Sequence, residues 1–287
     1  MRDAGHDPRL TPARGDIAAK YLEGKVEADR FVTGEEFEVV EALAPVREQP
    51  SSDAMLMTEA LRGERVTIYD RNGEGWAWGQ LNDDGYVGWL PDAALAKPKS
   101  APTHKVGVLR TFAFPGPSIK LPPADTLVMG SKIAVAREDG SFAVTRDGRF
   151  LPRTHLVPFD HREADFVSVA ERFVGTPYLW GGKSSFGIDC SGLVQVSLTA
   201  AGIGCPRDSD MQQTGLGRAL EPNERSSLLR GDLIFWKGHV GIVSGPDELL
   251  HANGHHMMVV KEPLSGAIAR IREKSYGEVT SVRRPAP

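Results

Sequence analysis

Cysteine is scarce in this 287-residue chain, which contains only Cys190 and Cys205. Two cysteines are too few for a disulfide framework, and reduced thiols are typical of cytosolic proteins. The sequence also lacks an apolar run of about 18 residues, so we expect no membrane-spanning helix. The N-terminal segment is polar and has no apolar signal-peptide core, which predicts a cytoplasmic location.

Excess positive charge is absent as well. The formal net charge is −4, which argues against a nucleic acid or an anionic membrane as partner. A hydrophobic content of 40% and a charged content of 25% are those of an ordinary globular protein, and the length suggests two or three domains.

Cys190 lies in the segment GIDCSGLVQ (187–195), where a small polar turn precedes an apolar-patterned stretch that ends at Gly202. The pattern predicts a helix at 190–201 with the cysteine in its first turn. A helix N-terminus favours the thiolate, the reactive form of cysteine. The alternative is a buried structural thiol, which the flanking Gly, Asp and Ser residues disfavour. We assign that structural role to Cys205.

A second segment, RGDLIFWKGHVGIVSG (230–245), has the pattern of two buried strands joined by a tight turn. His239 lies at the start of the return strand. A thiol at a helix start and a histidine on a strand are what nucleophilic thiol catalysis requires, because the imidazole can exchange a proton with the thiol and the leaving group.

Four motifs together resemble the NlpC family of papain-like cysteine peptidases. They are GTPYLWGGKSSFGIDCSGLVQ (175–195), PRDSDMQQ (206–213), RGDLIFWKGHVGIVSG (230–245) and LLHANG (249–254). The resemblance covers residues ~160–287 and implies an α+β papain-like fold, with helices at ~162–174 and ~190–201 before short strands from ~232 to ~284. It implies that Cys190 is the nucleophile and His239 the base. It also implies that His251 orients the imidazole and that Tyr178 helps to place an oxyanion.

The first 160 residues contain a weak internal repeat of hairpin patterns, turning at Asn72-Gly73 and at Asp139-Gly140. Each copy resembles a small all-β bacterial SH3-like barrel. An amphipathic pattern at 10–34 predicts a helix. We therefore expect four parts: an N-terminal helical brace (1–34), a first SH3-like domain (35–97), a second SH3-like domain (104–158) and the peptidase domain (160–287).

The resemblance implies a substrate. Relatives with SH3-like domains cut the bond between γ-D-glutamate and a diamino acid such as meso-diaminopimelate in murein tri- or tetrapeptides with a free L-alanine. We expect this reaction in wall-peptide recycling. Two alternatives remain open: a hydrolase or amidase of intact peptidoglycan, and a non-catalytic wall-binding protein.

The resemblance also implies substrate-binding residues. Asp189 and Ser191 are expected to hold the substrate ammonium, together with Glu59 and Tyr86 of the first SH3-like domain, because a buried ammonium must be paired. Arg207, Asp208 and Ser209 are expected to line the groove. The alternative for Arg207 is a surface salt bridge.

His255 and His256 raise the question of a metal site. Adjacent residues on a strand point to opposite faces, and no ligand-spaced Cys or carboxylate accompanies them. We interpret them as exposed histidines at a strand edge and expect no metal or other cofactor.

Overall fold

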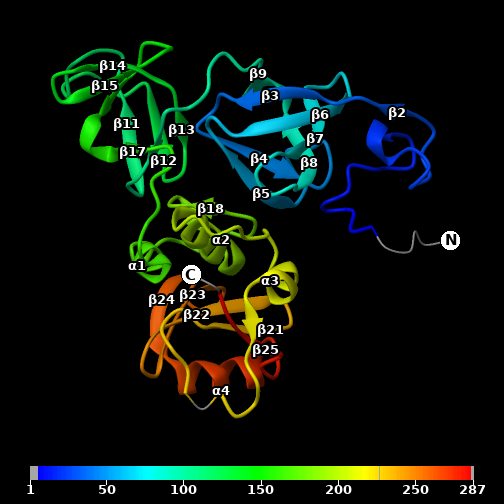
Figure 1. Cartoon of the computed structure of the whole chain (residues 1–287), viewed down its shortest axis with the longest axis vertical. Helices are drawn as coiled ribbons and strands as arrows, with labels where there is room; N and C mark the ends of the chain where they lie inside the picture. Colours follow the sequence, from blue (N-terminus) through cyan, green and yellow to red (C-terminus); the bar gives the residue numbers. More distant parts are fainter. Residues whose placement is uncertain (1–5, 226, 286–287) are drawn as a thin grey trace. The chain divides into compact units, whose positions relative to one another are not determined.

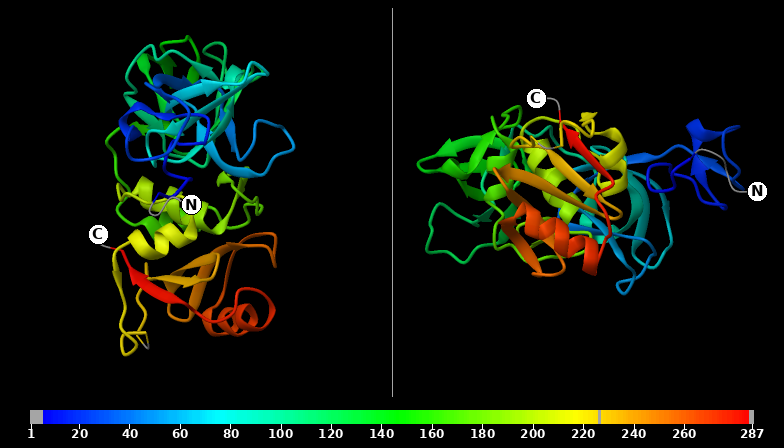
Figure 2. Two further views of the ribbon diagram at one scale, coloured as in Figure 1. Left: turned by 90° about the vertical axis from the view of Figure 1, so that its right-hand side faces the viewer. Right: turned by 90° about the horizontal axis from the view of Figure 1, so that it is seen from below.

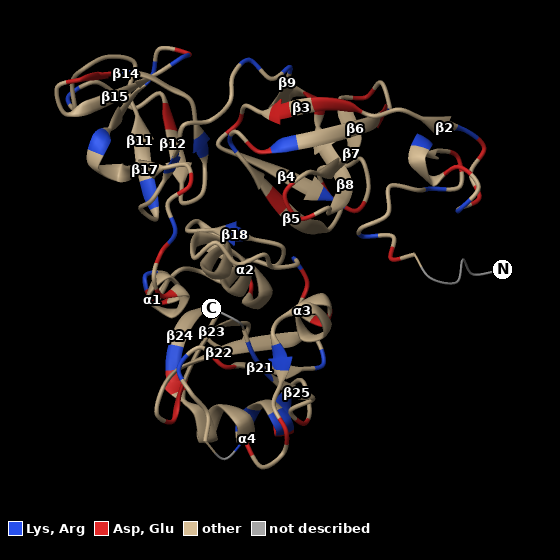
Figure 3. Cartoon of the chain, in the orientation of Figure 1, with Lys and Arg blue, Asp and Glu red and all other residues tan. Residues whose placement is uncertain are grey.

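The computed structural model describes residues 6–225 and 227–285, and the chain divides into two compact units, 1–161 and 162–287. Each unit is described by itself below (Figures 1 and 2). Charged residues of both signs occur in both units (Figure 3). Across the described residues, no helix is long and apolar enough to span a membrane.

The first unit begins with a seven-stranded sheet in the order β5-β4-β8-β7-β6-β3-β9. Its strands are β3 (Glu35–Val39), β4 (Leu43–Arg47), β5 (Leu56–Leu61), β6 (Arg65–Arg71), β7 (Trp76–Leu81), β8 (Val87–Pro91) and β9 (Leu95–Ala96). The predicted hairpin turn lies between β6 and β7, where Gly73 has φ +76° and Asn72 Oδ1 accepts the Glu74 N–H. A short 3₁₀ turn, η2 (Asp92–Ala94), joins β8 to β9.

The helix predicted at 10–34 is wrong. Residues 1–5 of the predicted N-terminal brace (1–34) lie outside the described part of the chain. The segment contains only the two-residue strands β1 (Ala18–Ala19) and β2 (Phe31–Val32) and the 3₁₀ turn η1 (Lys20–Leu22). Gly24 at φ +77° and Pro12 interrupt a continuous helix. In the apolar stripe, Ile17, Ala18 and Leu22 are buried, whereas Tyr21 is exposed. Ile17 packs against Trp78 and Trp89.

The rest of the first unit repeats part of this pattern. It contains β10 (His104–Val106), β11 (Arg110–Ala113), β12 (Asp125–Val128), β13 (Lys132–Ile133), β14 (Val135–Asp139), β15 (Phe142–Thr145), β16 (Phe150–Pro152), η3 (Arg153–His155) and β17 (Leu156–Pro158). The β14–β15 hairpin turns at Gly140, as predicted. The run from β16 through η3 to β17 repeats the strand–3₁₀–strand order of β8, η2 and β9.

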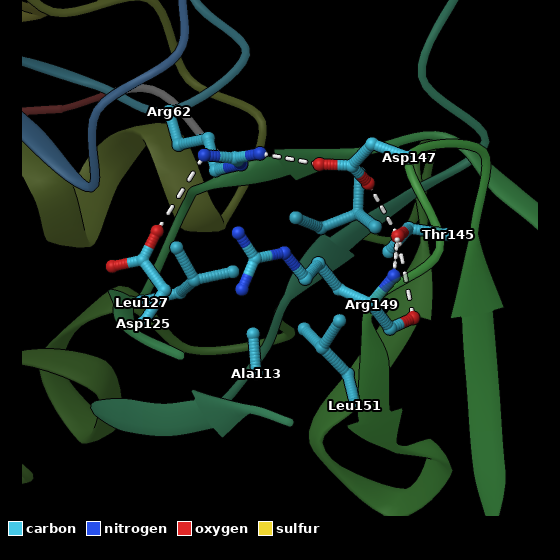
Figure 4. A pocket seen from close by; sticks show the side chains of 9 residues that line it. Arg62, Ala113, Asp125, Leu127, Thr145, Asp147, Arg149 and Leu151 are labelled. Atoms are coloured by element: carbon cyan, nitrogen blue, oxygen red, sulfur yellow. Dashed lines mark hydrogen bonds and ion pairs between the residues drawn. The ribbon is translucent and has the colours of Figure 1, made fainter. Parts of the chain in front are cut away.

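A small pocket in the first unit lies between Arg62 and residues of the segment 113–151 (Figure 4). Arg62, at the end of the β5 hairpin, pairs with Asp147 at 2.7 Å and with Asp125 at 3.5 Å. Arg149 also lines the pocket. These ion pairs join the end of β5 to the segment 113–151. None of the residues predicted for the active site lines this pocket.

The second unit combines an antiparallel six-stranded sheet, in the order β20-β25-β21-β22-β23-β24, with four helices in its described residues. The strands of this sheet are β20 (Arg218–Ala219), β21 (Leu233–Trp236), β22 (His239–Gly245), β23 (Glu248–Asn253), β24 (Met258–Pro263) and β25 (Ser281–Arg284). A separate two-stranded sheet pairs β18 (Lys183–Ser184) with β19 (Gly187–Ile188). The helices are α1 (Phe166–Glu171), α2 (Cys190–Ala200), α3 (Ser209–Gly215) and α4 (Leu264–Lys274). Helices α2 and α4 lie on opposite sides of the sheet (Figures 1 and 2).

Helix α2 and the β21–β22 hairpin form as predicted, and α1 is shorter than expected. The predicted run of strands from ~232 to ~284 is wrong at α4, which lies between β24 and β25. Leu264, Ala267 and Ile271 recur at helical spacing and pack on Trp236 and other residues of the sheet.

Asp232 joins strands β21 and β25 of the sheet through an ion pair. Its carboxylate is buried and binds the Arg284 guanidinium through two hydrogen bonds of 2.7 and 2.8 Å, and it also accepts the Leu229 N–H. A bidentate charge-assisted pair of this kind joins the start of β21 to β25.

We expect Asp232→Asn to destabilise the second unit by about 2 kcal/mol, because the amide cannot form the bidentate charge-assisted pair with Arg284. Scanning calorimetry of the full chain would measure the shift. Glu273→Gln, on the exposed side of α4, is the matched control and should leave the melting temperature unchanged. An unchanged melting temperature for Asp232→Asn would contradict the anchoring role.

Candidate active site

Asp189 and Cys190 form the start of helix α2. Asp189 is the N-cap, and its Oδ1 accepts the Gly192 N–H at 2.7 Å. Cys190 is the first helical residue and is 7% exposed. Gly192 is required here because a Cβ would lie 2.3 Å from the Gly182 carbonyl oxygen. The loop before the helix therefore packs directly on the turn that carries the thiol.

Arg207 is not a surface residue, because its side chain is 1% exposed. Its guanidinium binds both carboxylate oxygens of Asp189, at 2.9 and 2.7 Å, and donates to Ser191 Oγ at 2.9 Å. The Asp189 carboxylate also accepts the Gly181 N–H. The salt-bridge alternative for Arg207 is thus correct in kind, but the pair is buried rather than at the surface.

Gln212, which the sequence analysis did not single out, joins the PRDS turn to α2. Its side-chain amide donates to the carbonyl oxygens of Ser191 and Pro206, both at 2.9 Å. Asp208 is the N-cap residue of α3 and Ser209 its first residue, and both are partly exposed. These contacts bring Asp189, Ser191 and the 207–209 turn together.

His239 and His251 form a buried chain with a carboxylate. His239 Nε2 lies 2.8 Å from His251 Nδ1, and His251 Nε2 lies 2.7 Å from Glu262 Oε1. Both histidines are 1% exposed. Because Nε2 of His239 is engaged by His251, Nδ1 is the nitrogen left to face a reactant. Glu262 was not predicted, since strand pairing alone brings it beside His251.

Aromatic rings hold the His239 imidazole on two sides. The Tyr276 ring stacks on it with centroids 5.0 Å apart and an interplanar angle of 7°, and the Trp236 ring lies 5.6 Å away. Tyr276, just after α4, was also missed, because nothing in its local sequence distinguishes it from a core tyrosine. This packing restricts rotation of the His239 imidazole.

The Cys190 thiol lies beside strand β22. Burial and the charge of Asp189 raise the pKa of Cys190 to about 12, although the N–H groups of Val240 and Ser191 and the charge of Arg207 oppose this shift. Burial also lowers the pKa of His239 well below its usual range. The expected thiolate is therefore not the favoured form in the free protein, because desolvation outweighs the helix N-terminus. Burial therefore favours the neutral form of both the Cys190 thiol and the His239 imidazole.

Tyr178 lies close enough to interact electrostatically with Cys190 and Asp189. Burial, followed by the charge of Asp189, raises the pKa of Tyr178, so its hydroxyl stays protonated and can donate a hydrogen bond. Its backbone N–H donates to the Met257 carbonyl, and it forms an isolated bridge with Ile188.

Two predicted site residues belong to the first unit. Glu59 is a buried residue of β5, and Tyr86 packs in the core of the seven-stranded sheet. In the second unit, His255 and His256 lie in the turn between β23 and β24, not on a strand, and their rings touch with centroids 4.7 Å apart. The argument that adjacent strand residues point to opposite faces therefore does not apply to these two histidines.

Two family models match this chain. The NlpC/P60 family model matches residues 175–278, and that of the bacterial dipeptidyl-peptidase SH3 domain matches residues 46–95. The first match contains every residue of the histidine chain and Cys190. The second covers most of the seven-stranded sheet, so the first unit contains an SH3-like region.

Curated relatives match over much of their length. The gamma-D-glutamyl-L-lysine dipeptidyl-peptidase of Bacillus subtilis is 30% identical over 223 residues, which cover 70% of this chain and 73% of the relative. Dipeptidyl-peptidase 6 of Lysinibacillus sphaericus is 25% identical over 75% of this chain and 86% of the relative. The solved structure of an NlpC/P60 family protein from Bacillus cereus has a TM-score of 0.73 and 23% identity, covering 88% of this chain and 100% of that one, and so shares the fold.

We expect Arg207→Gln to cost about 3 kcal/mol of stability, because it leaves the Asp189 carboxylate buried without its cation. Arg172→Gln is the matched control: Arg172 pairs with Glu163 at the surface, where such pairs contribute about 0–1 kcal/mol. Thermal unfolding of both variants would measure the difference. Equal losses would contradict a buried, stabilising role for Arg207.

Proposed function

Because the chain belongs to the NlpC/P60 family of cysteine peptidases, we propose that it hydrolyses the γ-D-glutamyl–diamino acid bond of short murein peptides with a free N-terminal L-alanine. The names of the relatives from two Bacillus species, both gamma-D-glutamyl-L-lysine dipeptidyl-peptidases, support this substrate class. The observation that carries the proposal is the buried chain from His239 through His251 to Glu262, in which His239 belongs to β22, the strand that contacts Cys190.

In the proposed first step, Cys190 Sγ attacks the γ-carbonyl carbon while His239 Nδ1 takes the thiol proton. The C=O electrons move to oxygen and form a tetrahedral oxyanion. The Tyr178 hydroxyl and the Cys190 backbone N–H are the proposed donors to this oxygen. Because burial favours the thiol over the thiolate at Cys190, His239 must accept the thiol proton during the attack.

Collapse of the intermediate breaks the C–N bond, and the His239 imidazolium gives its proton to the departing amine of the diamino acid. The dipeptide remains as a thioester on Cys190. Water then attacks the thioester carbonyl, His239 accepts its proton, and the C–S bond breaks. The proton returns to sulfur, so the products are a carboxylic acid and an amine from one amide and one water.

We further propose that Asp189 and Ser191 face the substrate ammonium, with Glu59 and Tyr86 as the contribution of the SH3-like region. Arg207, Asp208 and Ser209 are proposed to line the groove. Because Arg207 already pairs with Asp189, an ammonium would share that carboxylate with a guanidinium. A second acid such as Glu59 would supply the remaining negative charge.

We propose that the reaction takes place in the cytoplasm, in the recycling of wall peptides. The two free cysteines support this location. We also propose that residues 104–158 form a second SH3-like domain, because the strand–3₁₀–strand order recurs there. Hydrolysis of intact peptidoglycan is the alternative function, and the substrate test below separates the two.

For the catalytic roles, we expect Cys190→Ala to abolish turnover and His239→Ala to be nearly as damaging, because residues of one catalytic unit act together. His251→Ala should be milder. Steady-state assays of purified variants would measure the losses, with Cys205→Ala as the matched control that retains activity. Full activity in Cys190→Ala would refute the nucleophile. A loss below about threefold in His251→Ala, or ~0.7 kcal/mol, would assign the orienting role elsewhere.

For the substrate, we expect the free-amine peptide L-alanyl-γ-D-glutamyl-diaminopimelate to be cleaved at least about a hundredfold more efficiently than its N-acetylated form, because acetylation removes the ammonium that Asp189 and Glu59 are proposed to bind. Chromatography of the products would compare the two peptides, the lysine analogue and intact sacculi. Equal cleavage of the blocked peptide, or efficient digestion of sacculi, would favour the wall-hydrolase alternative and remove the ammonium roles of Glu59 and Tyr86.

A further inference from the structure

Two polar side chains compete for one nitrogen of His251. On β23, His251 and Leu249 point to the same face of the sheet, and their partners on β24 are Val260 and Glu262. Glu262 is therefore a diagonal neighbour of His251 and reaches its Nε2 at 2.7 Å. Asn253, two residues further along β23, places its Nδ2 3.0 Å from the same nitrogen.

The orientation of the Asn253 amide is set from outside the site. Its Oδ1 lies 2.8 Å from the His256 backbone nitrogen, which is a donor, so this amide atom must be the oxygen acceptor. The NH₂ group is consequently the end that faces His251. Asn253 can only donate to Nε2.

Glu262, by contrast, can only accept. It is ionised at neutral pH, because burial, which raises its pKa, is outweighed by the hydrogen bond from His251 and the charge of Arg270, and the pKa of Glu262 stays below its usual range. Arg270, on α4, forms an ion pair with the same carboxylate oxygen. A bond from Nε2–H to a carboxylate is charge-assisted and stronger than a neutral one.

A neutral imidazole carries one proton, so the two contacts at Nε2 select opposite tautomers. If Nε2–H donates to Glu262, Nδ1 of His251 accepts the His239 Nε2–H, and His239 Nδ1 keeps its lone pair. If Asn253 donates to Nε2, the proton of His251 moves to Nδ1 and is donated to His239 Nε2. His239 Nδ1 then carries a proton and cannot accept one from the thiol.

We propose that Glu262 is a positioning residue that selects the tautomers of His251 and His239 and so leaves His239 Nδ1 as the proton acceptor for Cys190. This inference rests on the proposed function, because it assumes that His239 is the base. It concerns two successive hydrogen bonds, and Glu262 itself touches neither the substrate nor the thiol in this scheme.

The test is ¹⁵N NMR of the histidine side chains in the full chain, combined with steady-state kinetics on the free-amine peptide. Glu262→Met removes the acceptor at similar side-chain length and leaves Asn253 facing Nε2. We expect the unprotonated ring nitrogen of His239 to change from Nδ1 to Nε2. We also expect kcat to fall by about 10- to 100-fold with little change in KM, as for loss of a group that orients a base.

Two further variants separate positioning from a structural role. Asn253→Asp in the Glu262→Met background places a new acceptor beside Nε2, and it should restore the tautomer and most of kcat. Arg270→Met breaks the same ion pair but keeps the Glu262 carboxylate. It should lower the melting temperature while the tautomer stays as in the parent protein.

Each remaining outcome has a definite meaning. The inference would be overturned, whatever the activity, if the His239 tautomer were unchanged in Glu262→Met. It would also be overturned if Arg270→Met changed both the tautomer and kcat as Glu262→Met does. A switched tautomer with unchanged turnover would overturn His239 as the base, and with it the proposed mechanism. Failure of Asn253→Asp to restore either readout, in a variant that melts like the parent, would also refute the tautomer argument.

Discussion

The buried Asp189 carboxylate is the interaction on which the site depends. It caps helix α2, accepts the Gly181 N–H and binds both terminal nitrogens of Arg207. One group thereby joins the loop before Cys190, the first turn of the helix and the turn before α3. Each of its hydrogen bonds is charge-assisted and lies in a region with little water, where geometry is held most firmly. The position of the Cys190 thiol follows from this network.

Burial then determines the chemistry of the pair. Because water is excluded from both Cys190 and His239, each favours its neutral form. A neutral pair can react only if the imidazole presents a lone pair to the thiol, so the direction of each hydrogen bond behind His239 matters as much as its length. The Glu262 carboxylate at the end of the chain sets that direction and is itself held by Arg270.

Local signals predicted the parts of the fold that are built from neighbouring residues. The hairpins at Asn72-Gly73 and Asp139-Gly140 and the helix starting at Cys190 are confirmed, because turn chemistry and apolar periodicity act over a few residues. The helix predicted at 10–34 is wrong because glycine and proline interrupt the backbone, although Ile17 of its apolar stripe is buried against tryptophans of the sheet. Helix α4 was missed inside a segment interpreted as strands.

The sequence alone determined the family resemblance, the candidate thiol and the two candidate histidines, because these depend on residue types at fixed spacing along the chain. Only the tertiary structure decided that Arg207 is buried with Asp189, that Tyr276 stacks on His239 and that Glu262 and Asn253 both contact His251. These contacts arise from strand register and from packing between distant segments. Burial likewise exists only in the folded chain, and it raises the pKa of Cys190, against the thiolate expected from the helix start.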